Sequence, residues 1–294
     1  MRRPSLTVLC VLFYSVLSGQ NIVTYGLFTG TTIPLTFDAG INNDPRYEAR
    51  YDLKFSPIGI HYGVDYEGYG FIISPSIIKT GQNFNVINTV GGEVGTRKLD
   101  MTYVNLPITL KLHIIDLSFF KLSFVASGAF AYLVNGKETI THSYSKLRFP
   151  SQVIPNLPPD YTVQYDGVQS PAVHNYSMLS NGDFNPFQIN VAGGFRSDWE
   201  LSETLHVSLD LRANYGVLEP RNNAYLQRVN TYNTLYDVPG GRRDMFVYFT
   251  VGLSRYLEVD KKEKDRKKIT KGSKHLKSSA HFPWPKPRNR NPRR

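Results

Sequence analysis

The stretch TLHVSLDLRANYGV, residues 204–217, alternates between two kinds of side chain. One set is apolar, and the other is polar and includes a histidine, an aspartate and an arginine. Successive side chains of a β-strand point to opposite faces, so this pattern predicts a strand with one face suited to lipid. The apolar set is Leu205, Val207, Leu209, Leu211, Ala213, Tyr215 and Val217, and the polar set is His206, Ser208, Asp210, Arg212, Asn214 and Gly216.

The same alternation recurs along the chain. Each segment is about ten residues or a little longer, the length that a tilted strand needs to cross the hydrocarbon of a bilayer. The eight segments make an even number, as in bacterial single-chain barrels, and predict an all-β protein: an eight-stranded antiparallel transmembrane β-barrel. The other clear segments are 102–114, 119–133, 186–199 and 244–256, and the weaker ones, interrupted by Gly and Pro, are 22–34, 57–66 and 69–79.

Short and long connections alternate between these segments. This order is typical of an outer-membrane barrel with tight periplasmic turns and long extracellular loops, and it predicts that both termini are periplasmic. A soluble barrel of the lipocalin type would also alternate, but its apolar face would line a ligand cavity, whereas here the second face carries charges at mid-strand. The short connections are Glu67-Gly68, 115–118 and 200–203, and the long ones are 35–56, 80–99, 134–185 and 218–243.

The N-terminal segment has the composition of a secretory signal peptide. Arg2 and Arg3 precede an apolar run, LTVLCVLFYSVL, and Ser18 and Gly19 supply small residues for cleavage. We therefore expect a signal peptide at 1–19, a barrel at 20–260 and a disordered basic periplasmic tail at 261–294. The single cysteine, Cys10, lies in the apolar run, so we expect neither a disulfide nor a thiolate metal site in the mature chain.

The basic charge of the chain belongs to its ends. Of the formal net charge of +10, residues 261–294 contribute +12 and residues 1–19 contribute +2, which leaves −4 for residues 20–260. A high pI here does not predict binding to nucleic acid, because an exported chain leaves the compartment that holds DNA.

Seven charged residues fall on the polar faces of the predicted strands. A small barrel is filled by its side chains, and an isolated buried charge is very costly, so we expect these residues to form ion pairs in the barrel interior. The alternative is a path for protons or ions. The seven are Asp65, Lys111, Lys121, Arg196, Asp198, Asp210 and Arg212.

No catalytic, cofactor or metal site stands out. His142, Ser143 and His174 lie in the third long connection and resemble parts of a hydrolase site, but they do not define a nucleophile with its base and orienting group. A second group of histidines falls on polar faces of different strands at no ligand spacing. These are His61, His113 and His206.

The third and fourth long connections are rich in tyrosine. Tyrosine supplies a large amphipathic contact at low entropic cost, so these loops suit the recognition of glycans or proteins. Equally, they can close the barrel mouth as a lid or stand in an aromatic girdle. The recognition candidates are Tyr144, Tyr161, Tyr165 and Tyr176, and the fourth connection adds Tyr225, Tyr232 and Tyr236.

The tail has low hydrophobicity and high charge, which predicts disorder. In the periplasm its anionic partners would be peptidoglycan, inner-leaflet phospholipid or an acidic envelope protein. A solvated extension without a partner is the alternative. The binding candidates are Lys261, Lys262, Lys264, Arg266, Lys267, Lys268 and Trp284.

Several motifs resemble a known family. The segment Tyr103-Val104-Asn105-Leu106-Pro107-Ile108-Thr109-Leu110-Lys111 resembles the fourth strand of the PorT-like outer membrane β-barrel domain family common in Bacteroidota. Ser127-Gly128-Ala129, Arg212-Ala213-Asn214-Tyr215-Gly216 and Val251-Gly252-Leu253 extend the resemblance over most of residues 22–257. It implies an eight-stranded barrel with the N-terminus inside and little about activity, although PorT itself is associated with type IX secretion.

These observations favour a non-enzymatic, monomeric outer-membrane barrel without a cofactor, with aromatic loops outside and a basic tether inside. Its expected role is envelope organisation or an accessory part in secretion. A small-solute or ion conduit is the second hypothesis, and an outer-membrane enzyme is the third.

Overall fold

The computed structural model describes residues 22–117, 119–202 and 204–258. The predicted signal peptide at 1–19 and the predicted tail at 261–294 lie outside these ranges. The described residues from 22 to 257 form one compact unit. No helix among the described residues is long and apolar enough to cross a membrane.

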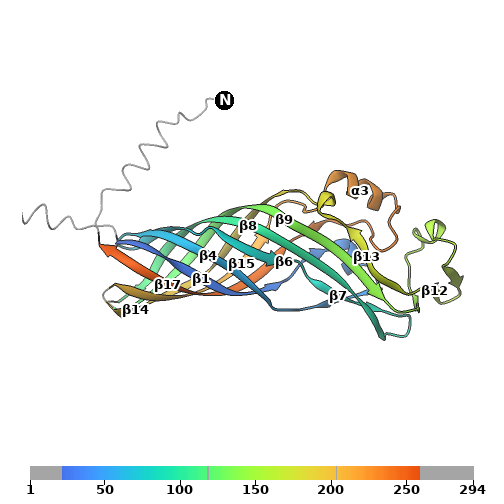
Figure 1. The fold of residues 1–294 in the computed structure, drawn as a ribbon, viewed down its shortest axis with the longest axis horizontal. Coiled ribbons are helices and arrows are strands. Elements are labelled where there is room, and N and C mark those ends of the chain that lie inside the picture. The colour runs from blue at the N-terminus through green and yellow to red at the C-terminus, as the bar shows by residue number, and fades with distance from the viewer. Residues whose placement is uncertain (1–21, 118, 203, 259–294) are drawn as a thin grey trace, which may run out of the picture. The chain divides into compact units, whose positions relative to one another are not determined.

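Eight strands close into a ring in which β17 hydrogen-bonds to β1 (Figure 1). The pairs from β1 with β4 around to β15 with β17 are antiparallel. The predicted eight-stranded antiparallel barrel is therefore confirmed. Its strands are β1 (Ile22–Pro34), β4 (Lys54–Asp65), β5 (Tyr69–Ile73) continued by β6 (Ser76–Thr80), β8 (Glu93–Asp116), β9 (Phe120–His142), β14 (Phe187–Ser202), β15 (Leu205–Gly216) and β17 (Met245–Glu258).

The third strand of the ring is broken once. Pro75 separates β5 from β6, and a proline has no amide hydrogen to donate to a ladder. Both halves pair with the same neighbours, β4 and β8, so the ring stays closed across the break.

The two faces of the strands separate as the alternation predicts. On β15, Asp210 and Arg212 are buried at 3% exposure each, while Leu211 between them is 50% exposed. The same division holds on β8, where Lys111 is buried and its neighbours Leu110 and Leu112 are exposed. In the eight-stranded ring, polar side chains therefore fill the inside and apolar side chains face outwards.

Two pairs of aromatic residues mark the limits of the apolar band. Phe120 contacts Trp199 in a tilted arrangement with ring centroids 4.5 Å apart, and Tyr132 meets Phe187 edge-on at 5.3 Å. Both pairs are cross-strand partners of β9 and β14. The span between them is about 40 Å along the strand, or about 30 Å along a barrel axis at the usual strand tilt, which matches the hydrocarbon core of a bilayer.

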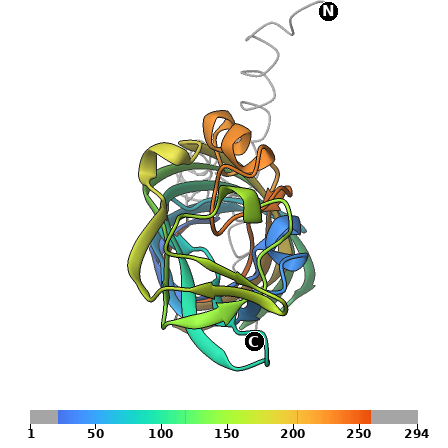
Figure 2. The same cartoon turned by 90° about the vertical axis from the view of Figure 1, so that its right-hand side faces the viewer.

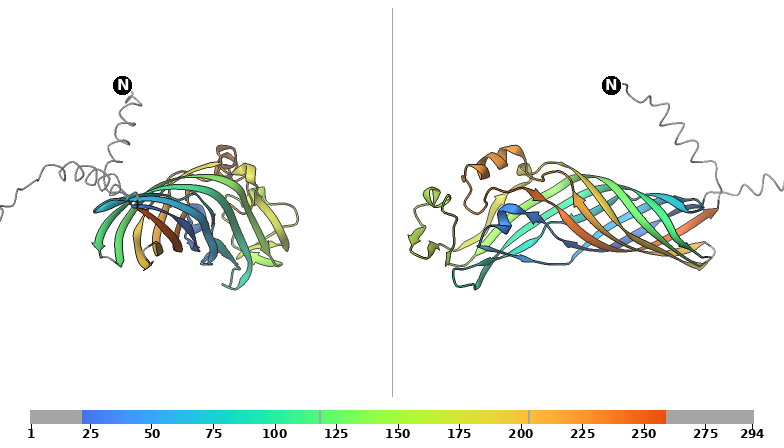
Figure 3. Two further views of the ribbon diagram at one scale, coloured as in Figure 1. Left: turned by 60° about the vertical axis from the view of Figure 1, so that its left-hand side comes forward. Right: turned by 180° about the vertical axis from the view of Figure 1, so that it is seen from behind.

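The strands continue beyond this band, and here the expected loop boundaries were wrong. Residues 93–99 and 134–142 are not loop but the outer parts of β8 and β9, paired from Gly95 with His142 onwards. β7 (Asn83–Ile87) pairs with β8, β3 (Tyr47–Arg50) pairs with β7, and β13 (Val173–Leu179) pairs with β9. Figure 3 shows these strands running on past the barrel proper.

We call this outer part the extension, made of residues 35–53, 81–103, 133–185 and 218–244. Its short elements fold over the end of the barrel that carries the long connections, the loop end (Figure 2). They are β2 (Phe37–Asp38), α2 (Ala39–Asn42), β10 (Ser145–Leu147), β11 (Thr162–Gln164), β12 (Gly167–Ser170), α3 (Asn223–Asn230), β16 (Arg242–Arg243) and two 3-10 turns, η1 (Ile154–Asn156) and η2 (Asn181–Asp183).

The apolar face changes sides in the extension. On β8, Leu99, Met101 and Tyr103 point inwards and are almost fully buried, whereas Val104 and Leu106, only a few residues further on, point outwards. Water surrounds a strand above the apolar band, so its apolar side chains are stable only inside. The extension thus has an apolar core of its own, which includes Val86, Ile140, Leu147, Val168 and Val238.

Candidate functional site

Six of the seven charged residues predicted for the interior meet in one chain of ion pairs. Lys111 binds Asp65 at 2.7 Å and reaches Asp198 at 3.6 Å. Arg196 then joins Asp198, at 2.9 Å, to Asp210, at 3.7 Å. The chain ends at Arg212, whose side chain binds Asp210 and donates a hydrogen bond of 2.7 Å to the Thr109 hydroxyl.

Strand geometry explains this network. Residues two apart on a strand share a face, which pairs Arg196 with Asp198 and Asp210 with Arg212. The register of β14 and β15 then sets Arg196 opposite Asp210. Beside the network lies a cavity of about 20 Å³, which has room for about one water molecule.

Lys121 does not join this network. Its ammonium lies 3.3 Å from Asp116, and both side chains are partly exposed near the tight connection of β8 and β9. The residue alternates with the inward set, but it stands at the end of the strand, where water reaches the side chain. At the end of a strand, the nearby turn therefore decides whether a side chain is buried, even where the alternation predicts that it faces inwards.

A second group of buried charges lies in the extension, and the sequence pattern did not predict it. We call it the arginine cluster: Arg46, Arg97, Arg221 and Arg242 with Asp38, Asp44, Glu138 and Asp237. Every side chain in it is at most 1% exposed. Its four positive and four negative side chains are fully buried, and Arg221 also binds the partly exposed Glu219 at 2.8 Å.

The arginine cluster ties together segments that are far apart in the chain. Arg242 binds Asp38 at 2.6 Å and Glu138 at 2.8 Å, and so links the first connection to β9. Asp237 of the fourth connection accepts from Arg97 at 3.1 Å and Arg221 at 3.3 Å. Burial alone would raise the pKa of Asp237, but the charges of its arginine neighbours hold that pKa below the usual value. The carboxylate therefore stays ionised and keeps the connections bound to the barrel.

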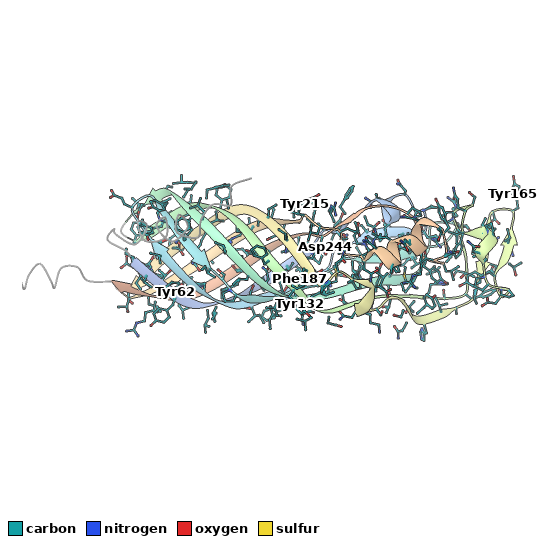
Figure 4. All side chains as sticks on the ribbon, turned by 90° about the horizontal axis from the view of Figure 1, so that it is seen from above. Tyr62, Tyr132, Tyr165, Phe187, Tyr215 and Asp244 are labelled. Carbon is teal, nitrogen blue, oxygen red and sulfur yellow. The ribbon has the colours of Figure 1, made fainter. Side chains whose placement is uncertain are left out.

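One buried acidic group lies beside the cluster. Asp244 directly precedes β17 (Figure 4); the Tyr103 hydroxyl lies beside its carboxylate, and among the described residues no cation forms an ion pair with it. Burial raises the pKa of Asp244 to about 6, against the opposing effect of Arg242. At neutral pH the ionised carboxylate of Asp244 therefore destabilises the folded chain.

The predicted recognition tyrosines divide into two pairs. Tyr161 and Tyr176 gather around Tyr236: the Tyr161 hydroxyl lies 2.7 Å from that of Tyr236, and the ring of Tyr176 lies 5.7 Å from its ring. Tyr144 and Tyr165 are exposed, and Figure 4 shows Tyr165 at the far tip of the extension. The structure thus brings together only half of the predicted set, with Tyr236 at its centre.

Around this group lies a cavity of about 450 Å³ between the third and fourth connections. Four tyrosines line it, together with short polar side chains. The volume falls in the range of about 300–1,000 Å³ that ligand pockets occupy. We call it the tyrosine cavity; its tyrosines are Tyr176, Tyr225, Tyr232 and Tyr236, and its polar residues include Asn156, Ser177, Asn233 and Thr234.

Helix α3 positions one wall of the tyrosine cavity. It begins at an N-cap, Asn222, whose side chain accepts from the Tyr225 amide at 2.8 Å. The Tyr225 hydroxyl then donates to Asp237 at 3.0 Å and so joins the cavity to the arginine cluster. Segment 153–158 and β13 supply the opposite wall.

The histidines are engaged in separate contacts. His142 bonds to the Tyr236 hydroxyl at 2.9 Å and to the Ser143 backbone carbonyl, while the Ser143 hydroxyl donates to Val94 instead. Burial lowers the pKa of His142, which keeps its ring neutral. His61 on β4 bonds to Ser254 on β17, across β1, and His113 bonds to Ser123 on the neighbouring strand β9. Among the described residues, no three His, Cys, Asp or Glu side chains are grouped to hold a metal ion.

The apolar outer band, polar interior and long-loop end together define an outer-membrane type of β-barrel. Residues 19–218 match the family described as "Outer membrane protein beta-barrel domain", and the chain belongs to that family. No curated protein matches the chain.

Solved structures that are similar to this chain include three from different bacteria. OprG of Pseudomonas aeruginosa is 9% identical over 82% of this chain and 97% of its own, with a TM-score of 0.38. The protease OmpT of Escherichia coli is 10% identical over 82% of this chain and 98% of its own, with a TM-score of 0.38. Ail, the attachment invasion locus protein of Yersinia pestis, is 10% identical over 79% of this chain and 97% of its own, with a TM-score of 0.31.

Proposed function

We propose that this protein is a closed, non-enzymatic, monomeric outer-membrane barrel that presents the extension at the cell surface as a recognition platform. The observation that supports this most is the filled interior, where the six-residue ion-pair network crosses the barrel between strands. An eight-stranded barrel is just wide enough for its side chains to fill. The arginine cluster closes the loop end with a second layer of paired charges.

The proposed orientation places the loop end outside the cell and both termini in the periplasm. It is supported by the tight connections at one end of the barrel and the long ones at the other, the arrangement of bacterial barrels. Intact cells would be labelled with an impermeant reagent at a cysteine introduced at Tyr165, which is fully exposed. Labelling is expected, and an equivalent cysteine at Glu67, in a tight connection, is the control that should stay unlabelled.

Conductance across a planar bilayer tests the closed barrel against the second hypothesis, a small-solute or ion conduit. The intact chain is expected to give no stable openings. The double variant Asp210→Ser with Arg212→Ser is the positive control, because it removes a positive and a negative side chain together and frees space in the interior. Stable openings in the unchanged chain would make the conduit its function.

We further propose that residues 261–294 are a periplasmic tether. Their charge of +12 supports binding to peptidoglycan, to anionic inner-leaflet lipid or to an acidic envelope protein. Co-sedimentation of the chain with peptidoglycan and with anionic liposomes, before and after deletion of these residues, tests the tether. Unchanged binding would dismiss it.

Within its family, we propose that the chain belongs to the PorT-like branch found in Bacteroidota and serves envelope organisation or an accessory role in secretion. The segment Tyr103 to Lys111, with Pro107 at its centre, supports this placement. Deletion of the gene followed by an assay of secreted proteins and of envelope integrity tests the role. If the deletion strain behaves like the wild type in both assays, the proposed role is wrong.

A further inference from the structure

The tyrosine cavity combines flat aromatic surfaces with short hydrogen-bonding groups. Tyr225 and Tyr236 are almost fully buried and form its floor, while Tyr176 is 48% exposed and Tyr232 is half-buried. The exposed pair thus offers ring surface to a ligand, and the buried pair is held in place by hydrogen bonds to Asp237 and His142.

Two amides and two hydroxyl side chains stand beside these rings. Asn156 donates through its amide nitrogen to the Tyr232 carbonyl at 3.2 Å, and Asn233 donates to Thr231 at 3.1 Å. Within the described part of the chain, neither amide oxygen accepts a side-chain hydrogen bond. Both oxygens therefore retain their capacity to accept from the hydroxyl groups of a ligand.

The charged groups of the tyrosine cavity are already neutralised by partners in the chain. Asp237 is bound to Arg97 and Arg221 in the arginine cluster. Arg228 forms an ion pair with Asp183 at 2.6 Å. A charged ligand would have to compete with these partners, so the lining favours a neutral one.

Tyr232, which lines the cavity, has an unusual backbone conformation. Its φ angle is 57°, in the left-handed region, where a residue with a bulky side chain is rare. It is the second residue after the end of α3: its amide donates to Val229 at 2.9 Å, and the next amide, of Asn233, donates to Arg228 at 2.9 Å. This is a Schellman motif, and its left-handed position is usually glycine, or sometimes asparagine.

A glycine would therefore satisfy the helix end better than the tyrosine does. The other non-glycine residue with positive φ in the described chain is Asn175, a residue type that tolerates this region. The Tyr232 side chain packs partly against the apolar core of the extension, and the rest of it lines the cavity. Strained residues of this kind cluster at active sites and ligand clamps, where the surrounding structure holds the strained conformation.

We propose that the tyrosine cavity binds a neutral carbohydrate, with the ring of Tyr232 packed against an apolar face of a sugar ring. The C–H groups of one sugar face contact tyrosine rings, while the sugar hydroxyls bond to the amide oxygens of Asn156 and Asn233. This inference rests on the proposed recognition function and specifies the ligand class of the platform.

Binding would be measured with the full chain folded in detergent micelles, with heat-modifiable migration as the check of folding. The probes are an array of neutral glycans and, for titration, glucose, galactose, mannose, N-acetylglucosamine and their disaccharides. Acidic sugars and short peptides are included as competing ligand classes. Saturable binding of at least one neutral sugar, in preference to the acidic sugars and the peptides, is expected.

The variant Tyr232→Gly separates a ligand role from a structural one. The relief of the left-handed backbone offsets the lost packing of the ring on the apolar core, so the unfolding midpoint should change little, and sugar binding should weaken about tenfold through loss of the aromatic contact. Tyr232→Phe retains the ring and should bind nearly as well as the unchanged chain. Tyr165→Ala, an exposed tyrosine outside the cavity, is the matched control and should leave binding unchanged.

Three results would overturn the inference: no saturable binding of any neutral sugar, a preference for acidic sugars or peptides, or unchanged sugar affinity in Tyr232→Gly. None of these results involves conductance or orientation. Stable channel openings would overturn the closed barrel and leave the sugar titration interpretable, so the two failures can be distinguished.

Discussion

The same strand, β8, has opposite chemistry in its two halves. Between the aromatic pairs, Ile108 and Leu110 face outwards, and Thr109 and Lys111 face inwards. In the extension, Leu99 and Met101 face inwards, and Lys98 and Asp100 face outwards. Odd-numbered residues face inwards and even-numbered residues face outwards along this whole stretch. The two halves therefore differ only in which of these faces carries the apolar residues. The medium around the strand, lipid or water, decides which face has to be apolar.

The two regions also assemble their buried charges differently. In the membrane-spanning barrel, partners such as Asp210 and Arg212 are two residues apart on one strand. In the extension, Arg242 joins Asp38 and Glu138, which lie more than a hundred residues away in the chain. Two pairs of the first network follow from local strand geometry, whereas most of the second exists only once the loops have folded over the barrel.

Breaking the interior network should have the largest effect. Asp210→Ala leaves both Arg196 and Arg212 without one carboxylate partner, and the loss of one member of a buried ion pair costs about 3–5 kcal/mol. Urea unfolding in micelles, followed by heat-modifiable migration, measures the change. A loss below about 1 kcal/mol, the value for an exposed pair, would contradict a dry and filled interior.

A charge on the outer face should distinguish the two halves of β8. Ile108→Arg places a cation in the apolar band and should cost about 2–4 kcal/mol at the bilayer midplane. Thr96→Arg, an outward position of the extension, should change the free energy of unfolding by no more than about 0.5 kcal/mol. Unfolding in lipid vesicles measures both, and equal costs would refute the boundary drawn at the aromatic pairs.

Asp244 should make stability depend on pH. Its pKa is about 6 in the folded chain, above the ordinary value of 3.8, so the folded state binds more protons between these values. Stability should therefore fall as pH rises from about 4 to about 6, and Asp244→Asn should restore up to about 3 kcal/mol at pH 7.5 and almost nothing at pH 3.5. Urea midpoints at the two pH values test this, and an equal gain at both would exclude titration of Asp244 as the cause.

The smallest effect is expected at the turn end. Lys121→Ala removes an exposed ion pair with Asp116 and should cost about 1 kcal/mol or less. High salt should reduce the difference further, because it screens exposed charges. A cost comparable to that of Asp210→Ala would show that Lys121 belongs to the interior network after all.

Much of the membrane-spanning barrel could be predicted because its signal is local. Each strand shows its two faces in its own residues, as β15 does from Leu205 to Gly216, and the register then brings Arg196 to Asp210. The extension was predicted as loop because its apolar residues are sparse and occupy the other face. The run Lys98-Leu99-Asp100-Met101-Thr102-Tyr103 alternates clearly, and this was the signal that could have revealed it.

The sequence by itself determined the alternation, the eight strands, the order of short and long connections and the pairs of charges two residues apart. These depend on side chains within one strand and on the two-residue period of that strand. Only the tertiary structure decided the arginine cluster, the gathering of Tyr161 and Tyr176 around Tyr236, and the left-handed backbone of Tyr232 beside a cavity. Such contacts join segments separated by long stretches of chain, and they become favourable only when the folded loops exclude water around them.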